Sequence, residues 1–198
     1  MSLKIFQVFA LACLAVFTFF ISDFRNKKGM LPLLNKKIVS IVKYSYFIPV
    51  FIYVYVILNL QNVFLNSYIG LLLTFGGAFL VAKAKIDLGA YHTWAGHILS
   101  STRIITHGIY ALIRHPLYTG IAIFISGGIV VAINNNPFSF FISIIIITFL
   151  ITMIFFLAFS ATRESIFLHK IFGDIFIEYK NQVHAFLTIK KYCVNKDV

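Results

Sequence analysis

The chain has 198 residues, of which 60% are hydrophobic and 17% aromatic, and its mean hydropathy is +0.92. This share of hydrophobic residues is larger than the core of a soluble protein needs, and it predicts an all-α, polytopic membrane protein. A net charge of +11 would favour nucleic-acid binding in a soluble protein, but here the basic residues border apolar segments, where membrane topology and anionic headgroups explain them. We therefore expect membrane lipids as partners and no nucleic acid.

Five apolar segments approach the roughly 20 residues that a helix needs to cross a bilayer. They are residues 3–21, 44–60, 68–82, 117–133 and 138–159. The first resembles a signal peptide because Lys4 precedes an apolar stretch, but it is long and lacks a small-residue cleavage site, so we expect a retained helix. The third is short, and Lys83 and Lys85 can lengthen it by reaching toward the headgroups.

The positions of lysine and arginine predict how these helices cross the membrane. All of the 17 lysines and arginines except Lys4 lie in three regions, residues 25–43, 83–114 and 163–196. The connections at 61–67 and 134–137 carry no charge. Because cytoplasmic loops are enriched in these residues, five alternating helices predict an N-terminus outside and a C-terminus in the cytoplasm.

The segment after the fifth span predicts a helical cap on the cytoplasmic side. Gly173 suits the end of a helix, and Asp174 can N-cap a short helix that packs back on the membrane face. The apolar residues of this helix recur at helical spacing, and they are Ile175, Phe176, Tyr179 and Val183.

The stretch "THGIYALIRHPLYTGIAIF", residues 106–124, gathers polar groups directly before the fourth span. Its glycines allow close approach of the backbone, its tyrosines offer aromatic faces, Arg114 offers a fork for an anion, and His115 can accept or donate a proton. Pro116 then suits the first position of a helix. These groups predict a pocket for a small, charged, partly aromatic ligand, although tyrosine and arginine are also ordinary residues of a membrane interface.

The histidines and cysteines do not predict a metal site. His92, His97, His107 and His115 are separated by five, ten and eight residues, whereas ligands on one helix face recur every three or four. The two cysteines, Cys13 and Cys193, are expected on different sides of the membrane, so we predict neither a disulfide nor a cysteine metal site.

Residues 88–183 resemble the isoprenylcysteine carboxyl methyltransferase family and its phospholipid N-methyltransferase relatives. The resemblance rests on "LGAYHTW", on "THGIYALIRHPLYTG" followed by a glycine-containing span and Asn134, and on "ESIFLHKIFGDIFIEYKNQV". It implies a small polytopic enzyme that uses S-adenosylmethionine. The chain is then one membrane domain, 1–198, with an N-terminal two-helix part at 1–66 and a catalytic part at 67–198.

The resemblance also implies a set of cofactor-binding residues. They are Thr102, Arg103, Ile104, Ile105, Tyr110, His115, Pro116, Leu117, Tyr118 and Glu164. The chemistry agrees, because the cofactor carries an ammonium for Glu164, a carboxylate for cationic donors, and a sulfonium that aromatic faces favour. His115 is the candidate proton acceptor, and Arg114 and Arg163 are candidate substrate contacts. A simple interfacial pair of Arg163 with Glu164 is the competing interpretation.

The sequence departs from the family pattern at several positions. Ser165 replaces a second acid, Phe176 a common tyrosine and His184 a common proline. Family members that act on prenylcysteine carry a substrate-binding arginine where this chain has Ser160. We therefore expect a lipid or another lipophilic small molecule as the methyl acceptor, unless Arg163 replaces the missing cation.

Two other functional classes remain open from the sequence. Membrane reductases of the sterol-reductase type share a similar "RHP-x-Y" segment and use a nicotinamide cofactor, but they usually have a longer chain with more spans. A non-catalytic membrane protein would retain the motif as part of its scaffold. The length of 198 residues and the five predicted spans favour the methyltransferase.

Overall fold

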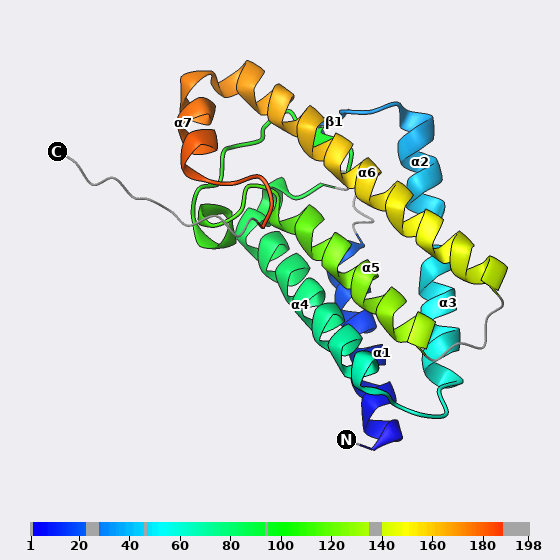
Figure 1. Cartoon of the computed structure of the whole chain (residues 1–198). Coiled ribbons are helices and arrows are strands. Elements are labelled where there is room, and N and C mark those ends of the chain that lie inside the picture. The colour runs from blue at the N-terminus through cyan, green and yellow to red at the C-terminus, as the bar shows by residue number, and fades with distance from the viewer. Residues whose placement is uncertain (1, 23–27, 46, 94, 135–139, 188–198) are drawn as a thin grey trace.

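The computed structural model describes residues 2–22, 28–45, 47–93, 95–134 and 140–187, and it consists of helices with a single small sheet among these residues (Figure 1). The helices are α1 (Leu3–Ile21), α2 (Lys36–Ser45), α3 (Phe47–Leu58), α4 (Leu65–Leu88), α5 (Pro116–Asn134), α6 (Phe140–Phe172) and α7 (Asp174–Gln182). Two 3-10 helices, η1 (Gly89–Tyr91) and η2 (Gly108–Ala111), and two strands, β1 (Met30–Pro32) and β2 (His97–Leu99), complete the structure. Trp94, Asn135 and Cys193 lie outside the described residues.

Five helical segments of the described chain are long and apolar enough to cross a bilayer, which confirms the predicted all-α polytopic class. The bounds of α1 agree with the prediction, whereas α2 and α3 together form the second span. The fifth span was expected to end at residue 159, and its helix, α6, continues beyond that point to Phe172. Hydropathy marks where a helix leaves the bilayer, and the polar residues beyond that boundary remain good helix formers.

Helices α4 and α5 form the centre of the bundle, where glycines bring their backbones together. A Cβ atom on Gly70 would lie 2.7 Å from the Gly127 carbonyl oxygen, and one on Gly77 would lie 2.5 Å from the Phe124 nitrogen. Small residues at such crossings are the usual way in which helices pack within membranes. Helix α1 covers this pair, and the ring of its Phe17 stacks on Phe124 with 3.8 Å between centroids.

The helical cap after the fifth span is present, but two of its predicted details are wrong. Gly173, with φ of +52°, ends α6 and is also the N-cap residue of α7, so Asp174 is the first residue of α7 and not its cap. A single residue in this left-handed region is enough to turn the chain, which leaves no separate extended position for Asp174. Ile175 is 67% exposed and does not join the buried face.

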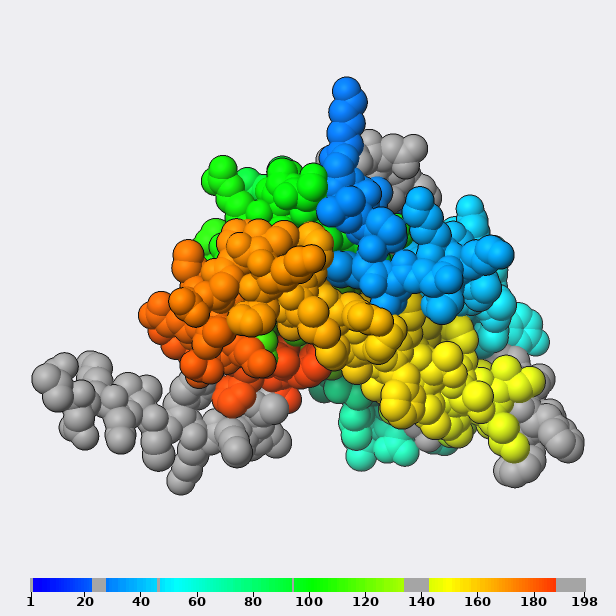
Figure 2. Space-filling model, turned by 90° about the horizontal axis from the view of Figure 1, so that it is seen from above, coloured from blue at the N-terminus to red at the C-terminus, as the bar shows by residue number. Residues whose placement is uncertain are grey.

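The buried face of α7 consists of three of the four predicted residues. Phe176, Tyr179 and Val183 pack with Ile104, Leu168 and Phe172. Figure 2 shows this end of the molecule, where the orange part of the chain lies beside the blue segment that leads into α2. The cap therefore returns the end of the chain to the residues that precede α5.

Candidate functional site

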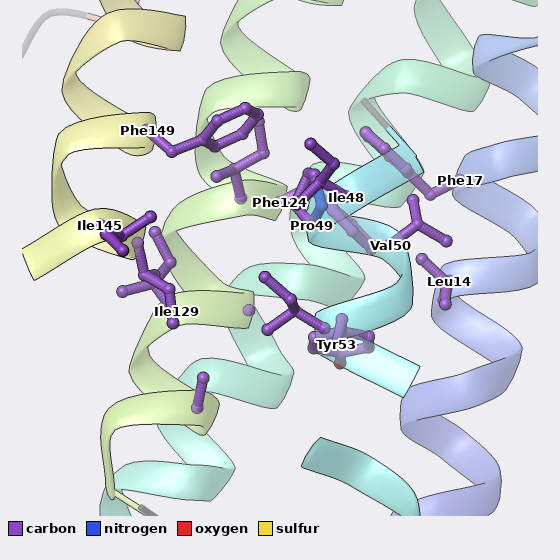
Figure 3. A pocket seen from close by; sticks show the side chains of 15 residues that line it. Leu14, Phe17, Ile48, Pro49, Val50, Tyr53, Phe124, Ile129, Ile145 and Phe149 are labelled. Atoms are coloured by element: carbon purple, nitrogen blue, oxygen red, sulfur yellow. The ribbon is translucent and has the colours of Figure 1, made fainter. Parts of the chain in front are cut away.

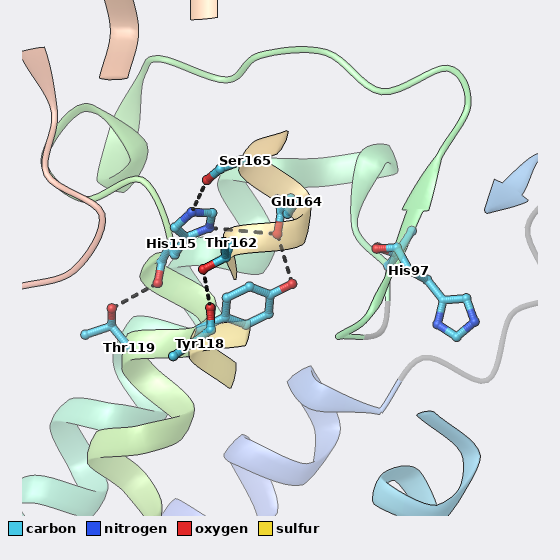
Figure 4. A network of polar contacts seen from close by, with 9 residues as sticks. His97, His115, Tyr118, Thr119, Thr162, Glu164 and Ser165 are labelled. Atoms are coloured by element: carbon cyan, nitrogen blue, oxygen red, sulfur yellow. Dashed lines mark hydrogen bonds and ion pairs between the residues drawn. The ribbon is translucent and has the colours of Figure 1, made fainter. Parts of the chain in front are cut away.

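A polar cluster joins the beginning of α5 to the C-terminal third of α6 (Figure 4). The Tyr118 hydroxyl donates a hydrogen bond of 2.9 Å to Glu164 Oε2, and His115 Nδ1 lies 3.8 Å from the same oxygen. The other ring nitrogen of His115, Nε2, lies 3.1 Å from Ser165 Oγ. The structure thus brings together three predicted site residues and adds Ser165, which the sequence predicted only as a departure from the family pattern.

The local sequence explains how α5 presents its two rings. Pro116 begins the helix as predicted, and the His115 carbonyl oxygen accepts hydrogen bonds from the Thr119 N–H at 3.0 Å and the Thr119 hydroxyl at 2.9 Å. His115 and Tyr118 are three residues apart, so their side chains lie on the same side of the helix start. Their rings are close to parallel, with 5.7 Å between centroids.

Burial determines the charge of His115. Its residue is only 5% exposed, and burial, together with the neighbouring Arg114 cation, lowers the pKa of the imidazole to about 3. His115 is therefore neutral at physiological pH. A histidine with so low a pKa is a weak general base, which argues against the expected role as proton acceptor.

Glu164 provides the carboxylate of the cluster and is partly accessible. Its side chain is 28% exposed, and its contacts with Tyr118 and His115 both use Oε2. Within the part of the chain that the structure describes, Oε1 has no hydrogen bond or ion pair. Burial, and then the Glu164 carboxylate, raise the pKa of the Tyr110 phenol.

The two arginines that were expected to contact substrate each have a contact within the protein. Arg163 is exposed on α6 with its guanidinium 5.3 Å from the centre of the Phe159 ring, and the structure records no ion pair between Arg163 and Glu164 among the described residues. Arg114 Nε donates a hydrogen bond of 2.9 Å to the Val183 carbonyl oxygen. Burial lowers the pKa of the Arg114 guanidinium.

The chain after α7 crosses the histidine motif as a strap, residues 183–186. The Arg114 N–H donates to the His184 carbonyl oxygen at 2.8 Å, and the His115 N–H donates to that of Ala185 at 3.0 Å. The Phe186 ring centroid lies 5.8 Å from that of His115. Main-chain hydrogen bonds from Arg114 and His115 hold the strap in place. The sequence did not predict these bonds, because they do not depend on side-chain type.

A second feature that the sequence did not predict holds the turn before the motif. Asp87 Oδ2 accepts the Ile109 N–H at 2.8 Å, and Oδ1 lies 2.5 Å from Lys83 Nζ. Gly108, with φ of +59°, passes so close that a Cβ atom there would collide with the Asp87 carboxylate. Asp87 therefore ties η2, which carries Tyr110, to the end of α4.

The remaining predicted cofactor residues are spread around this centre. Pro116 is fully buried, Leu117 lines a small apolar pocket, and Ile104 packs against the α7 cap. The Arg103 guanidinium lies 5.8 Å from the centre of the Tyr91 ring, and the Thr102 N–H bonds the Leu99 carbonyl oxygen. Ile105 is half-buried in the same loop.

An apolar pocket of about 200 Å³ opens in the span region between α1, α3, α5 and α6 (Figure 3). Its walls include Ile48, Phe124, Ile145 and Phe149, of which Ile48 and Ile145 are largely exposed toward the bilayer region. A smaller pocket of about 20 Å³ lies between this one and the polar cluster along α5 and α6. Phe149, Met153 and Leu157 of α6 line the two pockets. Ser160 and Glu164 continue the same spacing of three or four residues as far as the cluster. One face of α6 thus leads from the pockets to the cluster.

Comparison with known proteins gives two findings. The sequence profile of the family described as "Phospholipid methyltransferase" matches residues 65–175, which is more than half of the chain and includes the polar cluster. Two curated proteins from rice, Oryza sativa subsp. indica and subsp. japonica, each named "Probable protein-S-isoprenylcysteine O-methyltransferase", are 30% identical over 129 residues. That alignment covers 64% of this chain and 63% of the length of each relative.

Proposed function

The chain belongs to the phospholipid methyltransferase family, and we propose that it transfers a methyl group from S-adenosylmethionine to a lipophilic acceptor at the cytoplasmic face of a membrane. The observation that carries this proposal is the position of Glu164, beside Tyr118 and His115, with one carboxylate oxygen unoccupied by the described residues. A carboxylate held in this way suits the ammonium group of an amino-acid-like ligand.

The available side chains fit the chemistry of S-adenosylmethionine. Glu164 Oε1 would receive the ammonium, and the guanidinium nitrogens of Arg114 other than Nε are donors suited to the carboxylate. The rings of Tyr110 and Tyr118 offer aromatic faces to a sulfonium. When bound, the cofactor supplies an electrophilic methyl group on that sulfonium.

The protein's contribution is then mainly orientation. Well-oriented reactants reach effective molarities on the order of 10⁵–10⁸ M, so methyl transfer needs no covalent enzyme intermediate. The strap covers His115, which keeps water from this side of the site. Neutral His115 acts in binding rather than in proton transfer, because its low pKa makes it a weak base.

A lipophilic acceptor agrees with the pockets along α5 and α6. Their lining is apolar and part of it is exposed toward the bilayer region, so a hydrocarbon chain can enter sideways from the membrane. Ser160 is uncharged and Arg163 is turned toward Phe159, so neither supplies a fixed cation for a carboxylate acceptor. These contacts favour a lipid or a lipophilic small molecule over a prenylated protein C-terminus.

The test is isothermal titration of the detergent-purified protein with S-adenosylmethionine and, separately, with NADPH. We expect binding of S-adenosylmethionine alone. Binding of NADPH alone would replace the proposal with a reductase, and binding of neither would favour a non-catalytic membrane protein.

A further inference from the structure

A basic cluster lies where α2 packs against the residue that precedes β2, apart from the polar cluster around Glu164. We propose that Lys36, Lys43 and His97 form a binding site for a phosphate group, which an anionic phospholipid presents at the membrane surface. Both lysines precede residues 65–175, so most of this site lies outside the region that the family profile matches. The site goes beyond the proposed function and does not depend on it.

The two lysines lie on the face of α2 that packs against the rest of the protein. Val39 on this face is buried, and its Cγ2 atom would lie 3.0 Å from a Cβ atom on Gly96. Lys36 comes three residues before Val39 and Lys43 four residues after it, so the three side chains share one face of the helix. Two cationic side chains therefore flank the point at which α2 meets Gly96.

His97 follows Gly96 directly, and main-chain contacts hold it in place. Its strand, β2, pairs with β1, and Pro32 is the partner of His97 in this pairing. The Thr93 hydroxyl donates a hydrogen bond of 2.7 Å to the His97 carbonyl oxygen. Figure 4 shows the imidazole turned away from Glu164. The ring of His97 thus takes no part in the hydrogen bonds of the polar cluster.

The His97 imidazole has unused hydrogen-bonding capacity. Nδ1 is buried and has no hydrogen-bond partner among the described residues. An N–H on Nδ1 would therefore be buried without an acceptor, which costs free energy, so the neutral ring carries its proton on Nε2. Because His97 is only half-buried, Nε2 can donate this proton in a hydrogen bond to an anion.

The charges of this region lack an acidic counterpart in the neighbouring described segments. Residues 28–45 and 95–102 contain four lysines and His97 but no aspartate or glutamate. Burial, and then the charges of Lys43 and Lys36, lower the pKa of the His97 imidazole. A phosphate group bound here would offset the ammonium charges and accept a hydrogen bond from Nε2.

The opposite face of α2 explains why a lipid suits this site. Ile38 and Ile41 lie about half a turn around the helix from the two lysines, and they are 51% and 68% exposed. Since α2 begins the second span, these apolar side chains face the bilayer and the lysines lie at its boundary. An anionic phospholipid can therefore present its phosphate to the lysines without leaving the membrane.

The experiment follows the ring nitrogens of His97 in the full-length protein. The protein is labelled with ¹⁵N-histidine in an uncharged detergent, and the His97 signals are assigned by comparison with His97→Asn. It is titrated with short-chain phosphatidylglycerol and, separately, with inorganic phosphate. We expect phosphatidylglycerol to shift the His97 signals to saturation. The bound lipid should also raise the pKa of His97 by about one pH unit or more, because an adjacent anion stabilises the imidazolium.

Two lysine variants distinguish a defined site from diffuse surface charge. Lys43→Gln should weaken the binding of phosphatidylglycerol by roughly fivefold, which is the share that one lysine near an anionic lipid contributes. Lys37→Gln is the matched control, because it removes the same charge from a position about 100° around the helix from Lys36. We expect this control to bind like the wild type.

The two ligands also identify the source of the phosphate. Saturation by phosphatidylglycerol alone would support a lipid site, and saturation by inorganic phosphate would support a phosphate site that free phosphate also occupies. Unchanged His97 signals with both ligands would overturn the proposal, and so would an equal loss of affinity in Lys37→Gln and Lys43→Gln. The wild-type titrations decide the matter even if a variant fails to fold. None of these measurements uses S-adenosylmethionine, so their failure would leave the proposed function standing.

Discussion

Replacing Glu164 by Gln removes one negative charge and leaves the size of the side chain nearly unchanged. The amide oxygen of Gln can still accept the Tyr118 hydroxyl, which now lies 2.9 Å from Oε2, so the packing of α5 against α6 should persist. The charge that would attract a ligand's ammonium is lost. A hydrogen bond to a charged group contributes about 1.5–3 kcal/mol, and the 28% exposure of the Glu164 side chain places this case near the lower end. Since each 1.4 kcal/mol corresponds to tenfold, we expect roughly tenfold weaker binding of S-adenosylmethionine.

The assay is titration calorimetry on the purified variant, with thermal unfolding measured in parallel. Glu178→Gln is the matched control, because it makes the same change at an exposed position on α7. We expect it to bind like the wild type. If Glu164 only had an interfacial role, its substitution would cost at most about 1 kcal/mol of stability and leave affinity alone. Unchanged affinity in a folded Glu164→Gln protein would therefore refute the assignment of Glu164 to the cofactor.

Three further predictions concern packing, pH and topology. Gly77→Ala should destabilise the protein by about 1–3 kcal/mol, because its Cβ would lie 2.5 Å from the Phe124 nitrogen. The neighbouring variant Gly76→Ala is the control: its Cβ meets no atom within 4 Å, so it should be neutral or stabilising. Thermal unfolding of the two variants tests this. The pKa of His115 is about 3 in the folded state and about 6.5 in the unfolded state. Between these pH values the unfolded state binds one more proton than the folded state. The free energy of unfolding should therefore fall as the pH drops below about 6.5, and it should stay level above that pH. A His115→Gln variant that kept the full slope would contradict this. Reporter fusions after Asn135 and Gly173 should give opposite sidedness, with Gly173 in the cytoplasm, and matching sidedness would contradict the five-span topology.

The sequence predicted the spans well because bilayer thickness and hydropathy constrain them strongly. Hydropathy could not predict where α6 ends, because a helix can continue from the bilayer into water without any change in its hydrogen bonding. The cap of α7 was misplaced because Gly173 serves both as the end of one helix and the start of the next. Hydropathy therefore located the membrane segments and left the helix ends to local backbone geometry.

Part of the site was predictable because it lies in one short motif. His115 and Tyr118 are three residues apart, so a resemblance over that segment is enough to name both. The contact between His115 and Ser165 joins residues fifty positions apart and depends on how α5 and α6 align along their axes. The orientation of Arg114 toward Val183 depends likewise on the path of the strap. No pattern of residue types encodes such alignments.

The strap has a consequence for the order in which the protein becomes active. Synthesis proceeds from the N-terminus, so all the spans leave the ribosome before residues 183–186. Until then the N–H groups of Arg114 and His115 lack their carbonyl partners at His184 and Ala185. A nascent chain can therefore insert its helices into the bilayer while its histidine motif is still open on one side. Ligand affinity in this protein should arise as one of the last events of its biogenesis, after membrane insertion is complete.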